Sequence, residues 1–104
     1  MTDFTYETVL SRLDAHGIRT ITLNRPASLN AMNAQLIADV ASAFEDANAD
    51  PGTRSMIMTG AGKAFCAGDD RREHTHPETE EQARTLVDAI QRVTRAITLG
   101  PKPV

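Results

Sequence analysis

Several residue types are scarce in this 104-residue sequence. It contains no tryptophan, one tyrosine and a single cysteine, Cys66. One cysteine cannot form a disulfide within the chain, which is typical of proteins in a reducing compartment. No stretch approaches the roughly 20 apolar residues that cross a bilayer, and the N-terminus lacks the basic start and apolar run of a signal peptide. We therefore expect a soluble, cytoplasmic protein with no membrane partner.

The sequence also lacks a large excess of either positive or negative charge. The formal net charge is −3, from 14 acidic and 11 basic residues. A mildly acidic chain has no general attraction for nucleic acid, so we expect no nucleic-acid partner, and any anionic ligand must be held by local features. The hydrophobic fraction of 40% and the charged fraction of 24% are typical of a folded domain. The length suits one small domain.

Two β-strands are predicted near the N-terminus. Residues 5–13 are rich in Thr, Tyr, Val and Leu, and residues 18–23 alternate with β-branched side chains. Asp14 to Gly17 is a turn signal, so the two strands are expected to pair as a hairpin. Residues 24–26, Asn-Arg-Pro, end the second strand, and an irregular connection over residues 27–31 is expected to follow.

Two amphipathic helices and a short strand follow. The first helix is predicted to begin at Asn33, its N-cap, and a short buried strand is predicted over residues 55–59. The second helix is predicted to begin at Thr79, with Gln82 completing a capping box, and to end at Gly100. Its expected buried residues are Leu86, Val87, Ile90, Val93 and Ile97.

The order of these elements predicts an α/β fold built from right-handed β-β-α units. Residues 100–104, Gly-Pro-Lys-Pro-Val, have the pattern of a helix stop followed by the opening of another strand. A domain seldom ends on an opening strand. We therefore expect residues 1–104 to be part of a longer chain.

The segment of greatest chemical interest is the glycine-rich loop over residues 60–70. Gly60, Gly62 and Gly68 surround the small residues of the stretch 64–67, directly after the predicted strand. Small residues let the backbone come close to a ligand, and free N–H groups in such a loop can stabilise a carbonyl oxygen that becomes negative during a reaction. Most glycine-rich loops after strands are simple turns, so the pattern alone leaves both interpretations open.

Three motifs resemble signatures of the crotonase family, the enoyl-CoA hydratases and isomerases. Residues 21–26, Ile-Thr-Leu-Asn-Arg-Pro, followed by Asn-Ala-Met at 30–32, resemble its LNRP…NAL signature. Residues 63–70, Lys-Ala-Phe-Cys-Ala-Gly-Asp-Asp, resemble its KAFCAG-x-D signature. Residues 101–104 resemble the PKPV that opens its next strand. The motifs occur in the family's order and cover nearly the whole chain.

The resemblance implies a crotonase-like β-β-α spiral core, of which residues 1–104 would be the N-terminal half. It implies an acyl-CoA thioester-processing enzyme in which two backbone N–H donors stabilise an enolate. The first donor corresponds to the N–H of Asp69, where the family more often has Ala, Ser or Gly. The second donor and the acid/base carboxylates would lie beyond Val104, so we expect the isolated chain to be inactive. No cofactor is implied other than the coenzyme A of the substrate, and the full-length protein would be a homo-oligomer, a trimer or hexamer.

The resemblance also implies residues that seat coenzyme A, mostly through main-chain contacts. Asp70 matches the usual aspartate of the family and is expected to cap the next turn. Arg72 matches a frequently basic position near the phosphates, whereas Arg71 replaces an aliphatic residue. The candidate residues are Ala27, Ser28, Asn30, Ala31, Ala67, Gly68, Asp70, Arg71 and Arg72.

Other candidate sites have simpler interpretations. Cys66 has no His or Asp beside it in the sequence, which favours a structural role over that of a nucleophile. His74 and His76 have no third metal ligand defined, so we predict no metal site. A non-catalytic α/β fragment that binds a ligand or a partner remains the alternative to an enzyme.

Overall fold

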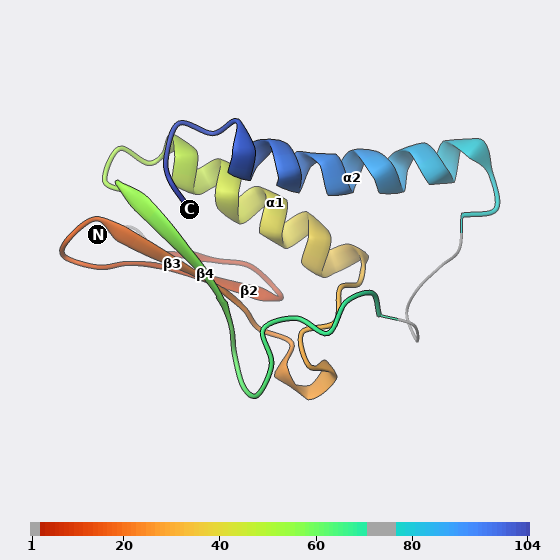
Figure 1. Cartoon of the computed structure of the whole chain (residues 1–104), viewed down its shortest axis with the longest axis horizontal. Helices are drawn as coiled ribbons and strands as arrows, with labels where there is room; N and C mark the ends of the chain where they lie inside the picture. The colour runs from red at the N-terminus through yellow and green to blue at the C-terminus, as the bar shows by residue number, and fades with distance from the viewer. Residues whose placement is uncertain (1–2, 71–76) are drawn as a thin grey trace.

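The computed structural model describes residues 3–70 and 77–104. The elements are β1 (Phe4–Thr5), β2 (Val9–Leu13), β3 (Ile18–Leu23), the short 3-10 helix η1 (Pro26–Ser28), α1 (Ala34–Ala49), β4 (Ser55–Gly60) and α2 (Glu80–Thr98). The sheet has the order β1-β2-β3-β4, with antiparallel pairing among the first three strands and parallel pairing of β3 with β4. Both long helices lie on one side of it (Figure 1). The predicted α/β class is confirmed.

Strands β2 and β3 form the predicted hairpin, in which Val9 lies opposite Leu23. Asp14 organises the turn, because its carboxylate accepts a hydrogen bond of 3.0 Å from the N–H of Ile18. Gly17 has a φ of +81°, a conformation that glycine adopts without the steric cost of a Cβ. Local residue choice therefore explains this part of the sheet.

The single strand predicted over residues 5–13 is wrong, because the chain turns back after β1 and pairs it with β2. The N–H of Tyr6 donates to the carbonyl of Val9 at 3.1 Å. The N–H and hydroxyl of Thr8 donate to the buried carboxylate of Asp39 on α1, at 2.9 and 2.6 Å. The interruption thus depends on a partner 31 residues away.

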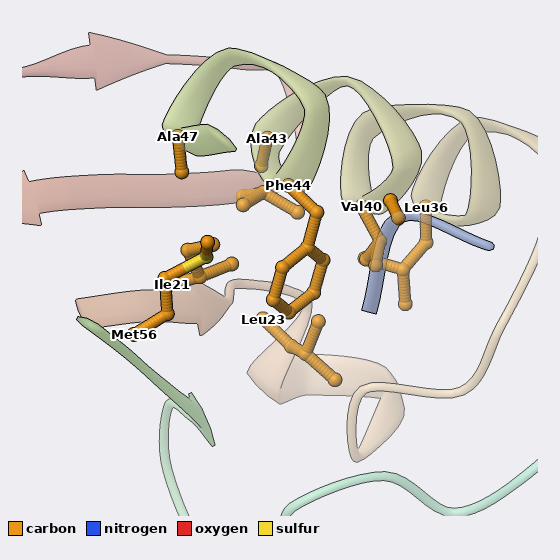
Figure 2. Packing of buried hydrophobic residues seen from close by; sticks show 10 residues of the cluster. Ile21, Leu23, Leu36, Val40, Ala43, Phe44, Ala47 and Met56 are labelled. Atoms are coloured by element: carbon orange, nitrogen blue, oxygen red, sulfur yellow. The ribbon is translucent and has the colours of Figure 1, made fainter. Parts of the chain in front are cut away.

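Helix α1 begins where the sequence predicts. The side chain of Asn33 accepts a hydrogen bond of 2.9 Å from the N–H of Leu36, and the inner face of the helix packs on the sheet. In Figure 2 the ring of Phe44 extends from α1 toward Ile21 and Leu23. The buried core consists of Val9, Ile21, Leu23, Leu36, Val40, Ala43, Phe44, Ala47, Met56 and Ala96.

Strand β4 is buried on one face only. Met56 is 3% exposed and belongs to the core beneath α1, whereas the neighbouring Ile57 points to the opposite face and is 52% exposed. Both long helices lie on the first face (Figure 1). The prediction of a buried strand at residues 55–59 is therefore wrong for its outer face.

Helix α2 begins at its predicted N-cap, since the hydroxyl of Thr79 accepts a hydrogen bond of 3.1 Å from the N–H of Gln82. It packs chiefly along α1 (Figure 1), and only Ala96 of its residues is buried. The predicted buried face is wrong for Val87 and Ile90, which are 48% and 46% exposed. Periodicity gave the apolar stripe, but only one edge of that stripe meets α1.

A buried cation joins the hairpin to the end of α1. The side chain of Arg19 is fully enclosed. It donates to the hydroxyl of Thr53 at 2.9 Å, to the hydroxyl of Ser11 at 3.1 Å and to the carboxylate of Asp50 at 2.7 Å. The ring of Phe4 lies 4.8 Å from the guanidinium carbon. Burial of this charge is tolerable because it is both paired and hydrogen-bonded.

The last four residues pass from α2 to the outer edge of β4 (Figure 1). There the N–H of Met56 donates to the carbonyl of Pro103 at 2.9 Å. The ammonium of Lys102 donates to the carbonyl of Ala47 at 2.8 Å, at the end of α1. Residues 101–104 form no strand. Among the described residues, the only strand-like contact of the predicted strand opening is the hydrogen bond between Met56 and Pro103.

Candidate active site

The loops that follow β3 and β4 meet at one edge of the sheet. We call residues 24–33 the first loop and residues 61–70 the second loop. Because β3 and β4 are parallel neighbours, their carboxyl ends lie side by side, which is a frequent location of ligand sites in α/β proteins. The N–H of Ala67 donates to the carbonyl of Leu29 at 3.0 Å, which fastens the second loop to the first.

Asn30 joins the two loops from inside. Its side chain is fully buried, and its amide nitrogen donates to the carbonyls of Ala61 at 3.0 Å and Ala64 at 2.8 Å. Its side-chain oxygen accepts from the N–H of Arg25 at 2.8 Å. The φ of Asn30 is +56°, a conformation in which Asn is enriched. The side chain of Asn30 therefore holds the loops together.

The close contact of the loops requires a glycine at the end of β4. A Cβ on Gly60 would lie 2.5 Å from the carbonyl oxygen of Phe65 and 2.6 Å from that of Ala64. It would also lie 2.8 Å from the amide nitrogen of Asn30. These distances are too short for any other side chain, so Gly60 permits the second loop to fold over the strand end.

Asp69 lies in an extended segment that pairs with Met32. The N–H of Met32 donates to the carbonyl of Gly68 at 2.7 Å, and the N–H of Asp70 donates to the carbonyl of Met32 at 3.0 Å. The residue between these two contacts directs its own N–H away from the partner segment. No residue in 3–70 or 77–104 hydrogen-bonds to the N–H of Asp69, and Asp69 is exposed. The described residues therefore leave this donor without an acceptor.

Gly68 sets the direction of that segment. Its φ is +102°, which a residue with a Cβ rarely adopts. A Cβ built on Gly68 would have no atom within 4 Å. None of the described residues therefore covers this side of the loop, and with respect to them glycine is needed for conformation rather than for space.

The two consecutive aspartates have opposite environments. Asp70 is 3% exposed, and its carboxylate accepts a hydrogen bond of 3.0 Å from the guanidinium of Arg25. The other arm of Arg25 donates to the carbonyl of Ala31. The carboxylate of Asp69 is exposed and has no hydrogen bond or ion pair with the described residues. Within the described part of the chain, the loop therefore presents one negative charge without an ion-pair partner beside an N–H without an acceptor.

Four of the predicted coenzyme A-binding residues lie on adjoining stretches of the two loops. Ala27, Ala67 and Gly68 are exposed, and Ser28 is half-buried. The hydrogen bond between residues 67 and 29 brings these stretches together. Main-chain groups of both loops are thus in reach of a single ligand, and the binding roles of these residues stay predictions.

The other predicted coenzyme A-binding residues are placed differently. Asn30, Ala31 and Asp70 are buried, and the side chains of Asn30 and Asp70 connect the two loops. These three residues support the conformation of the loops and do not line their exposed surface. Arg71 and Arg72 lie outside the described residues.

Two features of this site were not predicted from the sequence. No role was predicted for Arg25, because its partner Asp70 is 45 residues away. The second feature is a largely apolar groove of about 450 Å³ between the first turns of α1 and α2. The groove begins at Ala34, two residues after Met32, and is lined by Ala34, Ile37, Pro77, Glu81, Gln82, Thr85, Leu86 and Ala89.

The remaining candidates are simpler. Cys66 is half-buried and packs against the hydrophobic core. Residues 3–70 and 77–104 contain no group of three His, Cys, Asp or Glu side chains arranged to hold a metal ion, and His74 and His76 lie outside these residues. None of the helices in the same ranges is both long and apolar enough to cross a membrane.

The family model of the enoyl-CoA hydratases/isomerases matches residues 14–104. The chain belongs to the enoyl-CoA hydratase/isomerase family. It is 34% identical over 102 residues to the 1,2-epoxyphenylacetyl-CoA isomerase of Escherichia coli, covering 94% of this chain and 38% of that protein. It is 46% identical over 69 residues to the probable enoyl-CoA hydratase echA8 of Mycobacterium bovis, covering 66% of this chain and 26% of that protein. The crotonase resemblance of the three motifs is thereby confirmed.

A solved structure of this family shows the same fold. The crystal structure of an enoyl-CoA hydratase from Mycobacterium smegmatis matches with a TM-score of 0.83 and 34% identity, covering 93% of this chain and 38% of that one. The crotonase-like fold predicted from the motifs is confirmed. The chain spans about a quarter to two fifths of the length of the curated relatives described above.

Proposed function

We propose that this chain is the N-terminal part of an acyl-CoA thioester-processing enzyme of the enoyl-CoA hydratase/isomerase type. One observation carries the proposal. The N–H of Asp69 follows a glycine at φ +102°, points away from Met32 and has no hydrogen-bond partner in the described residues. A fixed N–H in this position is suited to donate a hydrogen bond to a thioester oxygen as that oxygen becomes the negatively charged enolate oxygen.

The physical reason for a main-chain donor is its rigidity. The segment is held on both sides of Asp69 by hydrogen bonds to Met32, so the donor does not need to reorganise when charge develops on the substrate. One such donor contributes roughly a hundred- to a thousand-fold in rate. In our proposal it polarises the thioester carbonyl and makes the neighbouring α-proton more acidic.

The rest of the substrate would occupy the surfaces around the donor. Coenzyme A would lie along residues 27–28 and 67–68, which are exposed except for the half-buried Ser28. The acyl group would enter the apolar groove between α1 and α2, whose lining includes Ile37 and Leu86. Binding would thus combine main-chain hydrogen bonds at the thioester with burial of the acyl chain.

Other parts of the machinery are proposed to come from sequence beyond Val104, in keeping with the fraction of each relative that this chain spans. These are the second N–H donor and the proton-transfer residues. We therefore expect residues 1–104 alone to show negligible turnover of crotonyl-CoA. We also propose a cytoplasmic location and a homo-oligomeric full-length protein that uses no cofactor besides the coenzyme A of its substrate.

A matched pair of ligands tests the proposed role of the thioester oxygen. Butyryl-CoA carries the carbonyl, and S-butyl-CoA is its thioether without that oxygen. Calorimetric titration of this chain should show tighter binding of butyryl-CoA, because only it can accept from the N–H of Asp69. In amide chemical-shift mapping, only butyryl-CoA should shift the Asp69 resonance strongly, while both ligands shift residues 27–28.

Free coenzyme A serves as the control for contacts outside the acyl group. Equal affinity for the thioester and the thioether, with no selective change at Asp69, would refute the oxyanion role. It would leave the alternative of a non-catalytic coenzyme A- or partner-binding fragment. Amide shifts confined to other surfaces would remove the site itself.

A further inference from the structure

The direction of the Asp69 N–H is not set by Asp69 itself. It depends on the pairing of Gly68 and Asp70 with Met32. The hydrogen bond of 3.0 Å from the N–H of Asp70 holds one side of this pairing. Whatever fixes Asp70 therefore fixes the donor one residue before it.

Arg25 is placed to do this. One arm of its guanidinium donates to the carboxylate of Asp70 at 3.0 Å, and the other donates to the carbonyl of Ala31. Ala31 directly precedes Met32, and Asp70 directly follows Asp69. Arg25 therefore binds both of the paired segments, one residue away from the pairing of Met32 with Asp69. The planar fork of an arginine can hold two acceptors in fixed geometry, which a lysine cannot.

The backbone of Arg25 is itself fixed. Its N–H donates to the side chain of Asn30 at 2.8 Å. Its carbonyl accepts from the N–H groups of Ser28 and Asn30 at 3.0 and 2.9 Å. The side chain of Arg25 is 14% exposed and that of Asp70 is 4% exposed, so water screens their attraction only weakly. The pair is therefore a rigid connection between the first and second loops.

Loss of the Arg25 guanidinium would change the position of Asp70 and, through it, the direction of the Asp69 N–H. The buried carboxylate of Asp70 would lose one hydrogen bond and one opposite charge, both supplied by Arg25, and removing one partner of a buried ion pair is costly. The carboxylate would move toward water. That movement would pull Asp70 away from Met32 and turn the N–H of Asp69.

We propose that Arg25 is a positioning residue, which acts through Asp70 to aim the N–H of Asp69 at the ligand. This inference rests on the proposed function for its consequence in binding. Its structural part concerns the loop alone and is measurable without a ligand.

The experiment compares Arg25→Gln with Arg84→Gln in the whole chain. Arg84 is also an ion-paired arginine, with Glu80 at 2.8 Å, but both side chains are at least 76% exposed. Arg25→Gln should shift the amide resonances of residues 68–70 and speed the hydrogen exchange of the Asp70 and Met32 amides. It should weaken butyryl-CoA binding by about tenfold or more, since small displacements of an oriented group are costly. Arg84→Gln should change none of these.

Two further variants separate positioning from loss of folding. Arg25→Lys keeps the charge and should retain the fold, yet it should shift the resonances of residues 68–70 in the same direction by a smaller amount. In an Asp70→Asn background, Arg25→Gln should cause little additional change at Asp69, because the proposed connection is already broken. Unchanged resonances of residues 68–70 in both Arg25 variants would overturn the inference, as would a full additional effect in the Asp70→Asn background.

The two proposals fail in different ways. If Arg25→Gln moves the Asp69 amide but the unaltered chain does not distinguish butyryl-CoA from S-butyl-CoA, the positioning role stands and the oxyanion role falls. If the unaltered chain binds the thioester selectively and Arg25→Gln binds it equally well, the positioning role falls alone.

Discussion

The guanidinium of Arg19 lies 2.7 Å from the carboxylate of Asp50, and the arginine side chain is entirely shielded from water. Asp50 is the C-cap of α1, whereas Arg19 belongs to β3, one of the two middle strands of the sheet. Two more groups around Asp50, the hydroxyl of Thr53 and the N–H of Gly52, donate to the same carboxylate at 2.7 and 3.1 Å. The charged form of Asp50 is therefore built into the folded state.

Protonation of Asp50 should make the free energy of unfolding depend on pH. The hydrogen bond from Thr53, followed by the contact with Arg19, lowers the pKa of Asp50 from 3.8 to about 2. Because the folded state holds this proton less readily than the unfolded state, the stabilisation is complete above pH 3.8 and is lost as the pH falls toward about 2. Asp50→Asn should therefore lower stability at neutral pH and flatten its dependence on pH in this window.

Urea unfolding at a series of pH values measures this effect. Asp88→Asn, on the solvent side of α2, provides the matched loss of a carboxylate and should leave the slope of the free energy of unfolding against pH unchanged. A slope for Asp50→Asn equal to that of the unaltered chain would contradict the assignment.

Two glycines should respond differently to the same substitution. Gly68→Ala puts a Cβ into open space at φ +102°, so its cost is conformational, roughly 1–2 kcal/mol. The chain should stay folded while the selective binding of butyryl-CoA over S-butyl-CoA is lost. Gly60→Ala forces a Cβ to 2.5 Å from a carbonyl oxygen and should destabilise the chain more. Thermal unfolding with parallel calorimetry checks both, and greater damage to folding from Gly68→Ala would refute this account.

The carboxylate of Asp69 should oppose binding of an anionic or polarised ligand. Asp69→Asn retains the N–H and the shape of the side chain but removes a charge that is exposed and unpaired in the described residues. Two unit charges about 4 Å apart in water interact by about 1 kcal/mol, so the affinity for butyryl-CoA should rise by roughly two- to fivefold. The gain should shrink at high salt, because exposed charges are screened.

Calorimetric titration at low and high salt tests the effect of Asp69. Asp70→Asn is the companion variant, and it should weaken binding because its carboxylate holds Arg25. If Asp69→Asn weakened binding as well, the carboxylate would have a favourable role that repulsion does not describe.

Local signals in the sequence predicted the starts of both long helices. Asn33 and Thr79 each accept a hydrogen bond from the N–H three residues later, and this depends only on neighbouring residues. The hairpin turn at Asp14 was predictable for the same reason. By contrast, the interruption between β1 and β2 depends on Thr8 and the distant carboxylate of Asp39, so the local pattern indicated one continuous strand.

Burial was predicted less well than periodicity. Val87 and Ile90 repeat at helical spacing, but the repeat does not reveal whether a partner covers that face. At the site, the motif containing Gly68 predicted a donor role for Asp69, and the structure gives its N–H no acceptor among the described residues; the role itself stays a prediction. The role of Arg25 was hidden because an ion pair across 45 residues leaves no mark on local composition.

The donor at position 69 belongs to the main chain, and its direction is set by Gly68, Met32 and the neighbouring Asp70. Mutation can therefore alter the charge and size of the side chain at position 69, beside the proposed site of the thioester carbonyl, while the N–H itself persists. A scaffold with this separation can explore new chemistry one residue at a time. In our proposal the aspartate of this sequence is one such variant, which would alter the electric field around the substrate without removing the N–H that binds it.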